Sequence, residues 1–90
     1  MDNKLREIII QKINDTLSNV DEIQNIIHSL GELSHENNAF SYGVVIGRLY
    51  NSFYYQCRRV LKRSPTEKEF LEFLEILKDK ESEIKEKINF

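Results

Sequence analysis

Apolar side chains recur at steps of three or four residues along three stretches of the chain, which is the spacing of one face of an α-helix. In the first stretch, these positions are Leu5, Ile9, Ile13, Leu17, Val20, Ile23, Ile27 and Leu30. The pattern continues through Ser18 without a change of phase, so we expect one long helix from about residue 3 to about residue 33. Residues 18–21 resemble a weak capping box, which leaves a break at Ser18 as the alternative.

A second helix is expected from about residue 39 to about residue 63, within a segment that has no acidic residue from Asn37 to Thr66. Its apolar positions form one broad arc on a helical wheel, which we interpret as the core face. They are Tyr42, Ile46, Leu49, Tyr50, Phe53, Cys57, Val60 and Leu61, flanked by Gly43, Val45, Gly47 and Tyr54.

The start of a third helix is predicted at Ser64, which would be the N-cap, with Pro65 as the first helical residue and Glu67 at the third position. This helix is expected to extend over about residues 65–88. Its core positions at helical spacing are Phe70, Phe73, Leu74, Leu77, Ile84 and Ile88, with Leu71 and Ile76 at the margins. The few linker residues before it favour an antiparallel neighbour.

Together the three stretches predict a single all-α domain over residues 1–90. We expect an up-down-up three-helix bundle, or a long helical hairpin with a third helix packed on it. A chain of 90 residues buries only a small core, and three long helices expose flanks that so few residues cannot cover. The sequence therefore predicts that a dimer completes the core.

Charge is unevenly distributed, although the net charge is only −2. The segment from Asn37 to Thr66 holds five basic and no acidic residues, whereas the segments before and after it are acidic. A single cysteine, Cys57, excludes an intramolecular disulfide. Charged residues interrupt every apolar run before it reaches membrane-spanning length, and the first ten residues do not resemble a secretion signal. We expect a cytoplasmic protein that does not enter a membrane.

Small residues occupy three successive positions four apart in the second helix, namely Ala39, Gly43 and Gly47. A glycine inside a helix costs roughly 0.8–1 kcal/mol relative to alanine, so two of them indicate a place where a bare backbone is needed. The simplest such place is a close helix crossing. The sequence favours equally a dimer seam and a tight crossing against the first helix of the same chain.

A basic line with a tyrosine in its middle follows another side of the second helix. Arg48, Tyr55, Arg59 and Lys62 share this face, with Arg58 beside them. Such a surface can contact phosphates and stack on rings, which would suit nucleic acid. The alternative is an ordinary solvated face. Because the flanking helices are acidic, the sequence favours an acidic protein partner or another copy of the chain over nucleic acid.

Candidate catalytic or metal-binding residues are few. Glu32 and His35 have the Glu-x-x-His spacing of helical metal sites, but a complete site would require duplication in a dimer, and a polar loop is favoured. Cys57 falls on the core face, where a thiol behaves as a small apolar side chain. We find no nucleophile paired with a base, no phosphate-binding loop and no zinc spacing. No enzymatic activity and no cofactor are expected.

The sequence thus predicts a non-enzymatic helical interaction or regulatory module that self-associates and binds a macromolecular partner. Two alternatives stay open. One is a small nucleic-acid-binding regulator that uses the basic face of the second helix. The other is a metal site built by a dimer around Glu32 and His35.

Overall fold

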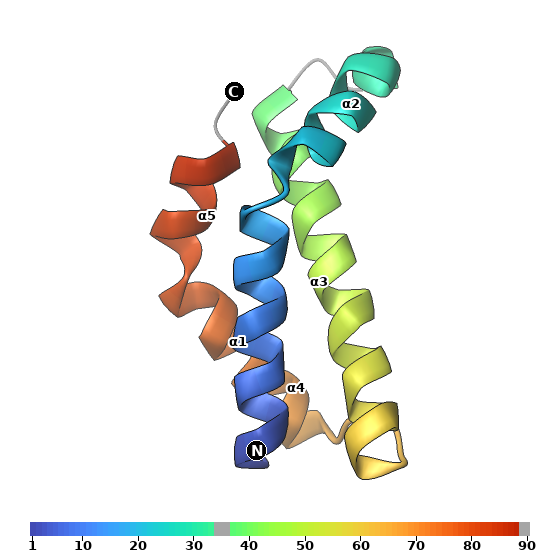
Figure 1. Cartoon of the computed structure of the whole chain (residues 1–90), viewed down its shortest axis with the longest axis vertical. Coiled ribbons are helices and arrows are strands. Elements are labelled where there is room, and N and C mark those ends of the chain that lie inside the picture. Colours follow the sequence, from blue (N-terminus) through green and yellow to red (C-terminus); the bar gives the residue numbers. More distant parts are fainter. Residues whose placement is uncertain (34–36, 89–90) are drawn as a thin grey trace.

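The structure is a computed structural model that describes residues 1–33 and 37–88 (Figure 1). The described residues form helices and connecting turns without any strand, which confirms the predicted all-α class. The elements are α1 (Asn3–Leu17), α2 (Val20–Leu30), the short 3-10 helix η1 (Gly31–Leu33), α3 (Asn37–Leu61), α4 (Glu67–Asp79) and α5 (Glu81–Ile88).

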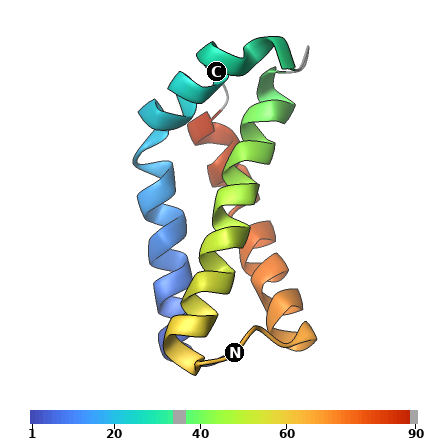
Figure 2. The ribbon, with the colours of Figure 1, turned by 90° about the vertical axis from the view of Figure 1, so that its right-hand side faces the viewer.

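The helices lie in an elongated arrangement that measures 38 × 22 × 20 Å. In both ribbon views α1 and α3 run side by side along the long axis in opposite directions, and α2 crosses one end (Figures 1 and 2). After α3 the chain turns at the other end and returns through α4 and α5 (Figure 2). The main core therefore lies between α1, α3 and the α4–α5 segment, while α2 closes one end.

The core consists of apolar side chains from all five helices. At its centre the rings of Phe53 and Phe73 are parallel, with their centroids 4.4 Å apart. The buried apolar residues are Leu5, Ile9, Ile13, Leu17, Ile23, Ile27, Val45, Leu49, Phe53, Cys57, Phe73, Ile76, Leu77, Ile84 and Ile88. Most of the positions predicted from helical spacing in the first and third stretches are among them.

The first stretch forms two helices, so the prediction of one continuous helix is wrong. Asp2 begins α1 by accepting a hydrogen bond from the backbone N–H of Leu5 at 2.9 Å. Ser18 ends α1, because its hydroxyl and its backbone N–H both donate to the carbonyl of Asn14. Asn19 then leaves the helical region, with φ −123° and ψ 47°, and α2 turns across the end of the bundle. The apolar pattern hides this break because α1 and α2 both face the same core.

The third stretch also differs from its prediction at its start and in its middle. The N-cap is Thr66 and not Ser64, because the Thr66 hydroxyl accepts from the Glu69 backbone N–H while the Glu69 carboxylate accepts from the Thr66 backbone N–H. Pro65 therefore precedes the cap, and α4 begins at Glu67. A second interruption at Lys80 separates α4 from α5.

The buried face of α3 is rotated relative to the predicted arc. Leu49, Phe53 and Cys57 are buried as expected, but Val45 is fully buried whereas Ile46 and Tyr50 remain 38% and 44% exposed. Among the described residues, α3 packs against α1 and α2 on one side and against the α4–α5 segment on another. Because apolar residues extend over more of α3 than these neighbours cover, part of the arc faces solvent.

Candidate functional site

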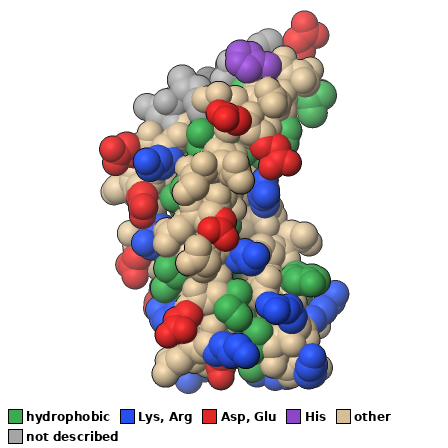
Figure 3. All heavy atoms as spheres, in the orientation of Figure 1, with side chains coloured by type: hydrophobic (Ala, Val, Ile, Leu, Met, Phe, Trp, Pro, Cys, Tyr) green, Lys and Arg blue, Asp and Glu red, His purple; other side chains and the backbone are tan. Residues whose placement is uncertain are grey.

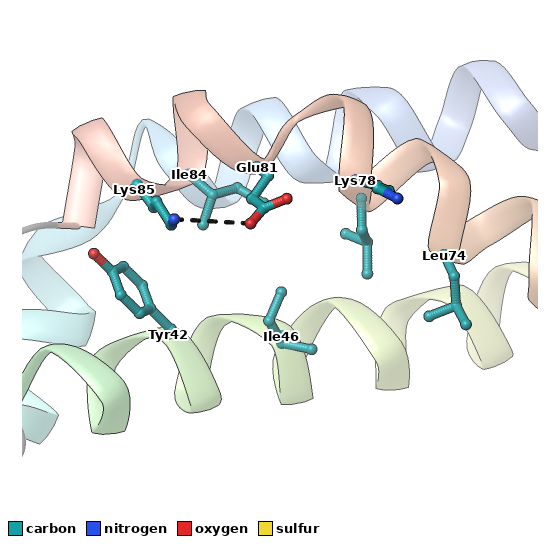
Figure 4. A pocket seen from close by; sticks show the side chains of 8 residues that line it. Tyr42, Ile46, Leu74, Lys78, Glu81, Ile84 and Lys85 are labelled. Carbon is teal, nitrogen blue, oxygen red and sulfur yellow. Dashed lines mark ion pairs between the residues drawn. The ribbon is translucent and has the colours of Figure 1, made fainter.

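An apolar groove lies between α3 and the α4–α5 segment and has a volume of about 350 Å³ (Figure 4). Tyr42 and Ile46 stand on α3 and face Leu74 from α4 and Ile84 from α5. The complete lining is Tyr42, Ile46, Leu74, Leu77, Lys78, Glu81, Ile84 and Lys85. We call this feature the apolar groove.

The break at Lys80 positions this groove. Leu74 and Leu77 come from the last turns of α4, and Ile84 comes from α5, so the lining residues lie on both sides of the interruption. Leu77 and Ile84 are buried at the base, whereas Leu74 is 43% exposed at the edge. Apolar side chains therefore line the groove from its base to the edge at Leu74.

The rim of the apolar groove carries charges of both signs. The ammonium group of Lys85 lies 3.8 Å from the Glu81 carboxylate one turn earlier on α5 (Figure 4). Lys78 is exposed on α4 beside them. Exposed pairs of this kind contribute about 0–1 kcal/mol, so they can exchange partners at little cost.

Exposed apolar side chains extend the apolar groove along α3 and α4. Leu71, one turn before Leu74 on α4, is 53% exposed. Tyr50, one turn after Ile46 on α3, makes edge-to-face contacts with the rings of Tyr54 at 5.2 Å and Phe70 at 5.9 Å. A hydrogen bond with the Tyr54 side chain raises the pKa of Tyr50 above its ordinary value of 10.0, with a smaller contribution from desolvation.

The small residues Ala39, Gly43 and Gly47 lie exposed on the side of α3 that also bears Ile46 and Tyr50. A Cβ atom added at either glycine would meet no atom within 4 Å. No described part of α1 therefore lies against the two glycines, which contradicts the predicted tight crossing with the first helix at Gly43 and Gly47. The dimer seam through these residues stays a prediction.

The basic residues predicted as a partner site all lie on the surface of α3 or at its end. Arg48, Tyr55, Arg58, Arg59 and Lys62 are exposed, and Lys and Arg side chains gather over the lower half of α3 in Figure 3. Two of them have partners within the chain: Arg48 contacts Glu22 of α2 at 3.0 Å, and Arg59 donates to the Gln56 amide oxygen at 3.5 Å. Tyr55 is 62% exposed.

A second groove, of about 500 Å³, lies between α1 and α3 next to this basic line. We call it the polar groove. Residues of both helices and of the turn after α1 line it: Lys12, Asp15, Thr16, Asn19, Arg48, Asn51, Ser52, Tyr55 and Gln56. The structure thus brings Arg48 and Tyr55 together with α1 side chains that the sequence did not single out. The sequence did contain one sign of this groove. Thr16 and Gln56 are polar residues on the buried faces of their helices, where apolar residues are usual.

The structure does not place the remaining candidate residues, Cys57 and the Glu32/His35 pair, in a catalytic or metal-binding site among the described residues. Cys57 is buried, and desolvation raises the pKa of its thiol, with a smaller contribution from the Glu69 charge. Among the described residues, no three His, Cys, Asp or Glu side chains lie where they could hold a metal ion together. His35 of the Glu32/His35 pair lies outside the described residues.

Comparisons with protein families, with curated proteins and with solved structures give no match to this chain. Within residues 1–33 and 37–88, no helix combines the length and the apolar character that crossing a membrane requires.

Proposed function

We propose that this chain is a non-enzymatic helical interaction module that self-associates, and that the apolar groove with its extension along α3 and α4 receives a second copy. The observation that carries this proposal is the exposure of Ile46 and Tyr50, one turn apart on α3, together with Leu71 and Leu74, one turn apart on α4, each between 38% and 53% exposed. Ile46 and Leu74 line the same groove, which joins the two helices' exposed residues. Contiguous exposed apolar surface that crosses two elements is typical of an interaction site.

A second copy suits this surface in shape. Gly43 and Gly47 lie within the same exposed arc of α3 as Ile46, and no atom of another described element lies within 4 Å of a Cβ added at either glycine. Glycines in a helix face allow two backbones to approach closely, and α3 is long enough for two copies to cross there. The cost of two helix-interior glycines is then offset by the contact between copies.

A second copy also suits the surface in charge. The first charged residue of α3 is Arg48, so the exposed arc around Gly43 carries no charge that would repel its own copy. The rim of the apolar groove holds Lys78, Glu81 and Lys85, and surfaces that carry both signs can complement themselves about a two-fold axis. A strongly acidic or basic partner would match only part of this rim.

The basic line of Arg48, Tyr55 and Lys62 lies roughly opposite this arc on the helical wheel of α3. A dimer formed through the apolar groove would leave this line open. Its exposed cations then support binding of an acidic macromolecular partner by the assembled dimer.

Sedimentation equilibrium at low and at high salt tests the self-association. We expect a dimer whose dissociation constant changes little with salt, because apolar contacts are not screened by ions. Replacing Ile46 and Leu74 together by Asp should weaken the dimer by at least an order of magnitude, since each dimer would bury four carboxylates. Tyr55→Asp is the matched control, because Tyr55 is the most exposed of these apolar residues and lies outside the apolar groove. A monomer at all concentrations, or equal effects of the two changes, would contradict the proposal.

A further inference from the structure

The polar groove between α1 and α3 is lined by two polar side chains that are almost completely buried. Each has a polar atom at the groove without a hydrogen-bond partner among the described residues. Gln56 is only 4% exposed and Thr16 only 6% exposed. Gln56 uses its amide oxygen to accept from Arg59, but its amide nitrogen and the Thr16 hydroxyl have no hydrogen-bond partner among the described residues. Neither atom is among the fully enclosed unpaired atoms, so both reach the space of the groove.

The two side chains are almost completely buried, and their free polar atoms are directed to the open space beside them, where water or a ligand can form hydrogen bonds with them. An apolar pair at these two positions would have extended the core between α1 and α3. The polar choice therefore points to hydrogen bonding with something that enters the groove.

Two cations stand at the mouth of the groove. Lys12 projects from α1 and has no ion-pair partner among the described residues. Arg48 projects from α3 and pairs with Glu22, but both side chains are about half or more exposed, so an incoming anion can replace this partner at little cost. Asp15 also lines the groove, and its carboxylate is already held by the Gln11 amide at 2.8 Å.

An aromatic face completes the wall. Tyr55 contacts no other ring among the described residues and is 62% exposed, so its ring is available for stacking. The volume of about 500 Å³ falls within the range of small-molecule sites, roughly 300–1,000 Å³.

From these four features we infer that the polar groove binds a small anionic molecule that carries a planar ring, of the mononucleotide class. Lys12 and Arg48 contact the anionic group, the ring stacks on Tyr55, and Gln56 and Thr16 hydrogen-bond to polar atoms of the ligand. The groove is formed within one copy of the chain, so this inference does not depend on self-association.

A titration followed by backbone amide NMR shifts tests the inference, with AMP, UMP, adenosine and ribose 5-phosphate as separate probes. We expect at least one of the two mononucleotides to shift the amides of Thr16, Tyr55 and Gln56. Adenosine lacks the anion and ribose 5-phosphate lacks the ring, so each should bind at least tenfold more weakly than the better mononucleotide. If neither mononucleotide shifts these amides at millimolar concentration, or if ribose 5-phosphate binds as well as the nucleotides, the inference is overturned.

Variants and a longer probe separate this site from a general attraction of anions to α3. Tyr55→Leu removes the stacking ring and should weaken nucleotide binding about tenfold, whereas Lys62→Gln removes a charge just after the end of the same helix, outside the groove, and should have little effect. Equal effects of the two changes would overturn the inference. A five-nucleotide RNA that binds tenfold more tightly than the mononucleotides, with shifts reaching Lys62, would also overturn it and would indicate a strand-binding face instead.

Discussion

Arg63 and Glu69 form a two-armed ion pair that ties the turn after α3 to the first turn of α4. Nη1 of Arg63 lies 2.7 Å from Oε1 of Glu69, and Nη2 lies 3.1 Å from Oε2. The same carboxylate accepts hydrogen bonds from the backbone N–H and the hydroxyl of Thr66. The Arg63 contact lowers the pKa of Glu69 from 4.5 to about 2, with smaller contributions from Thr66, although burial acts in the opposite direction. One side chain thus completes the capping box and fixes the turn between the helices.

We predict that this carboxylate makes stability depend on pH in the acidic range. Because its pKa is lower in the folded chain than in the unfolded one, its contribution is complete above about pH 5 and is lost as the pH falls toward about 2. Glu69→Gln should remove about 1–2 kcal/mol at neutral pH, a value reduced because Arg63 is half exposed. It should also flatten the acid limb in urea denaturation measured between pH 2 and pH 7. Glu75→Gln, at an exposed position of the same helix, is the control, and an acid limb that Glu69→Gln leaves unchanged would contradict the prediction.

The parallel rings of Phe53 and Phe73 predict where the fold is most sensitive to a cavity. Both side chains are almost fully buried, and their centroids lie 4.4 Å apart. Phe53→Ala should lower the free energy of unfolding by about 3–5 kcal/mol, which is a large part of the stability of a small domain. Leu30→Ala, at a half-exposed position, should change it by about 0.5 kcal/mol or less. Urea denaturation monitored by circular dichroism measures the free energy of unfolding of both variants. If the two variants lose similar amounts of stability, Phe53 does not lie at the centre of the core.

The backbone at Lys62 allows a stabilising substitution. This residue follows the last residue of α3 with φ 60°, and its N–H donates to the carbonyl of Arg58 at 3.1 Å. A left-handed conformation costs a residue with a Cβ roughly 1–2 kcal/mol, whereas glycine adopts it freely. We therefore expect Lys62→Gly to raise the free energy of unfolding by about 1 kcal/mol and Lys62→Ala to leave it unchanged or lower. Thermal denaturation of the two variants measures the effect. A glycine variant that is less stable than the unchanged chain would contradict the left-handed conformation at Lys62.

Helical spacing indicated which residues share a face, and the structure shows why it could not indicate how far each face is covered. Val45 and Ile46 are adjacent and apolar, and the sequence placed Ile46 in the core and Val45 beside it. Only the packing of α3 against its neighbours decides that Val45 is buried and that Ile46 is 38% exposed. The exposed apolar surface could therefore not be predicted from the sequence, because it depends on how the helices pack.

Breaks between helices were hidden for a related reason. Leu17 and Val20 remain in phase across the turn at Ser18, because both halves of the first stretch face one core. The cap at Thr66 was missed because Ser64 and Thr66 both precede a glutamate three residues later, and only the contacts of Glu69 distinguish them. The polar groove joins Thr16 to Gln56 across 40 positions of sequence, and such a pairing depends on the register of α1 against α3.

Gly43 and Gly47 give a prediction in which folding and assembly respond in opposite directions. No atom that the structure describes beyond the adjoining helix backbone lies within 4 Å of a Cβ added at either position, so alanine fits both sites within one copy. Each Gly→Ala change should stabilise α3 by up to about 0.8–1 kcal/mol, because alanine has the higher helix propensity. In the proposed dimer the same methyl groups stand between two crossing helices and should weaken self-association several-fold.

The double variant Gly43→Ala with Gly47→Ala is therefore compared with Ser52→Ala, which also raises helix propensity but lies on the opposite side of α3, among the residues that line the polar groove. Urea denaturation at low concentration reports the stability of one copy, and sedimentation equilibrium reports the dimer. We expect both variants to be more stable as single copies and only the glycine variant to dimerise more weakly. If the glycine variant dimerises as tightly as the unchanged chain, the two copies do not cross closely at α3. The role of the apolar groove is tested separately by the replacement of Ile46 and Leu74 with Asp.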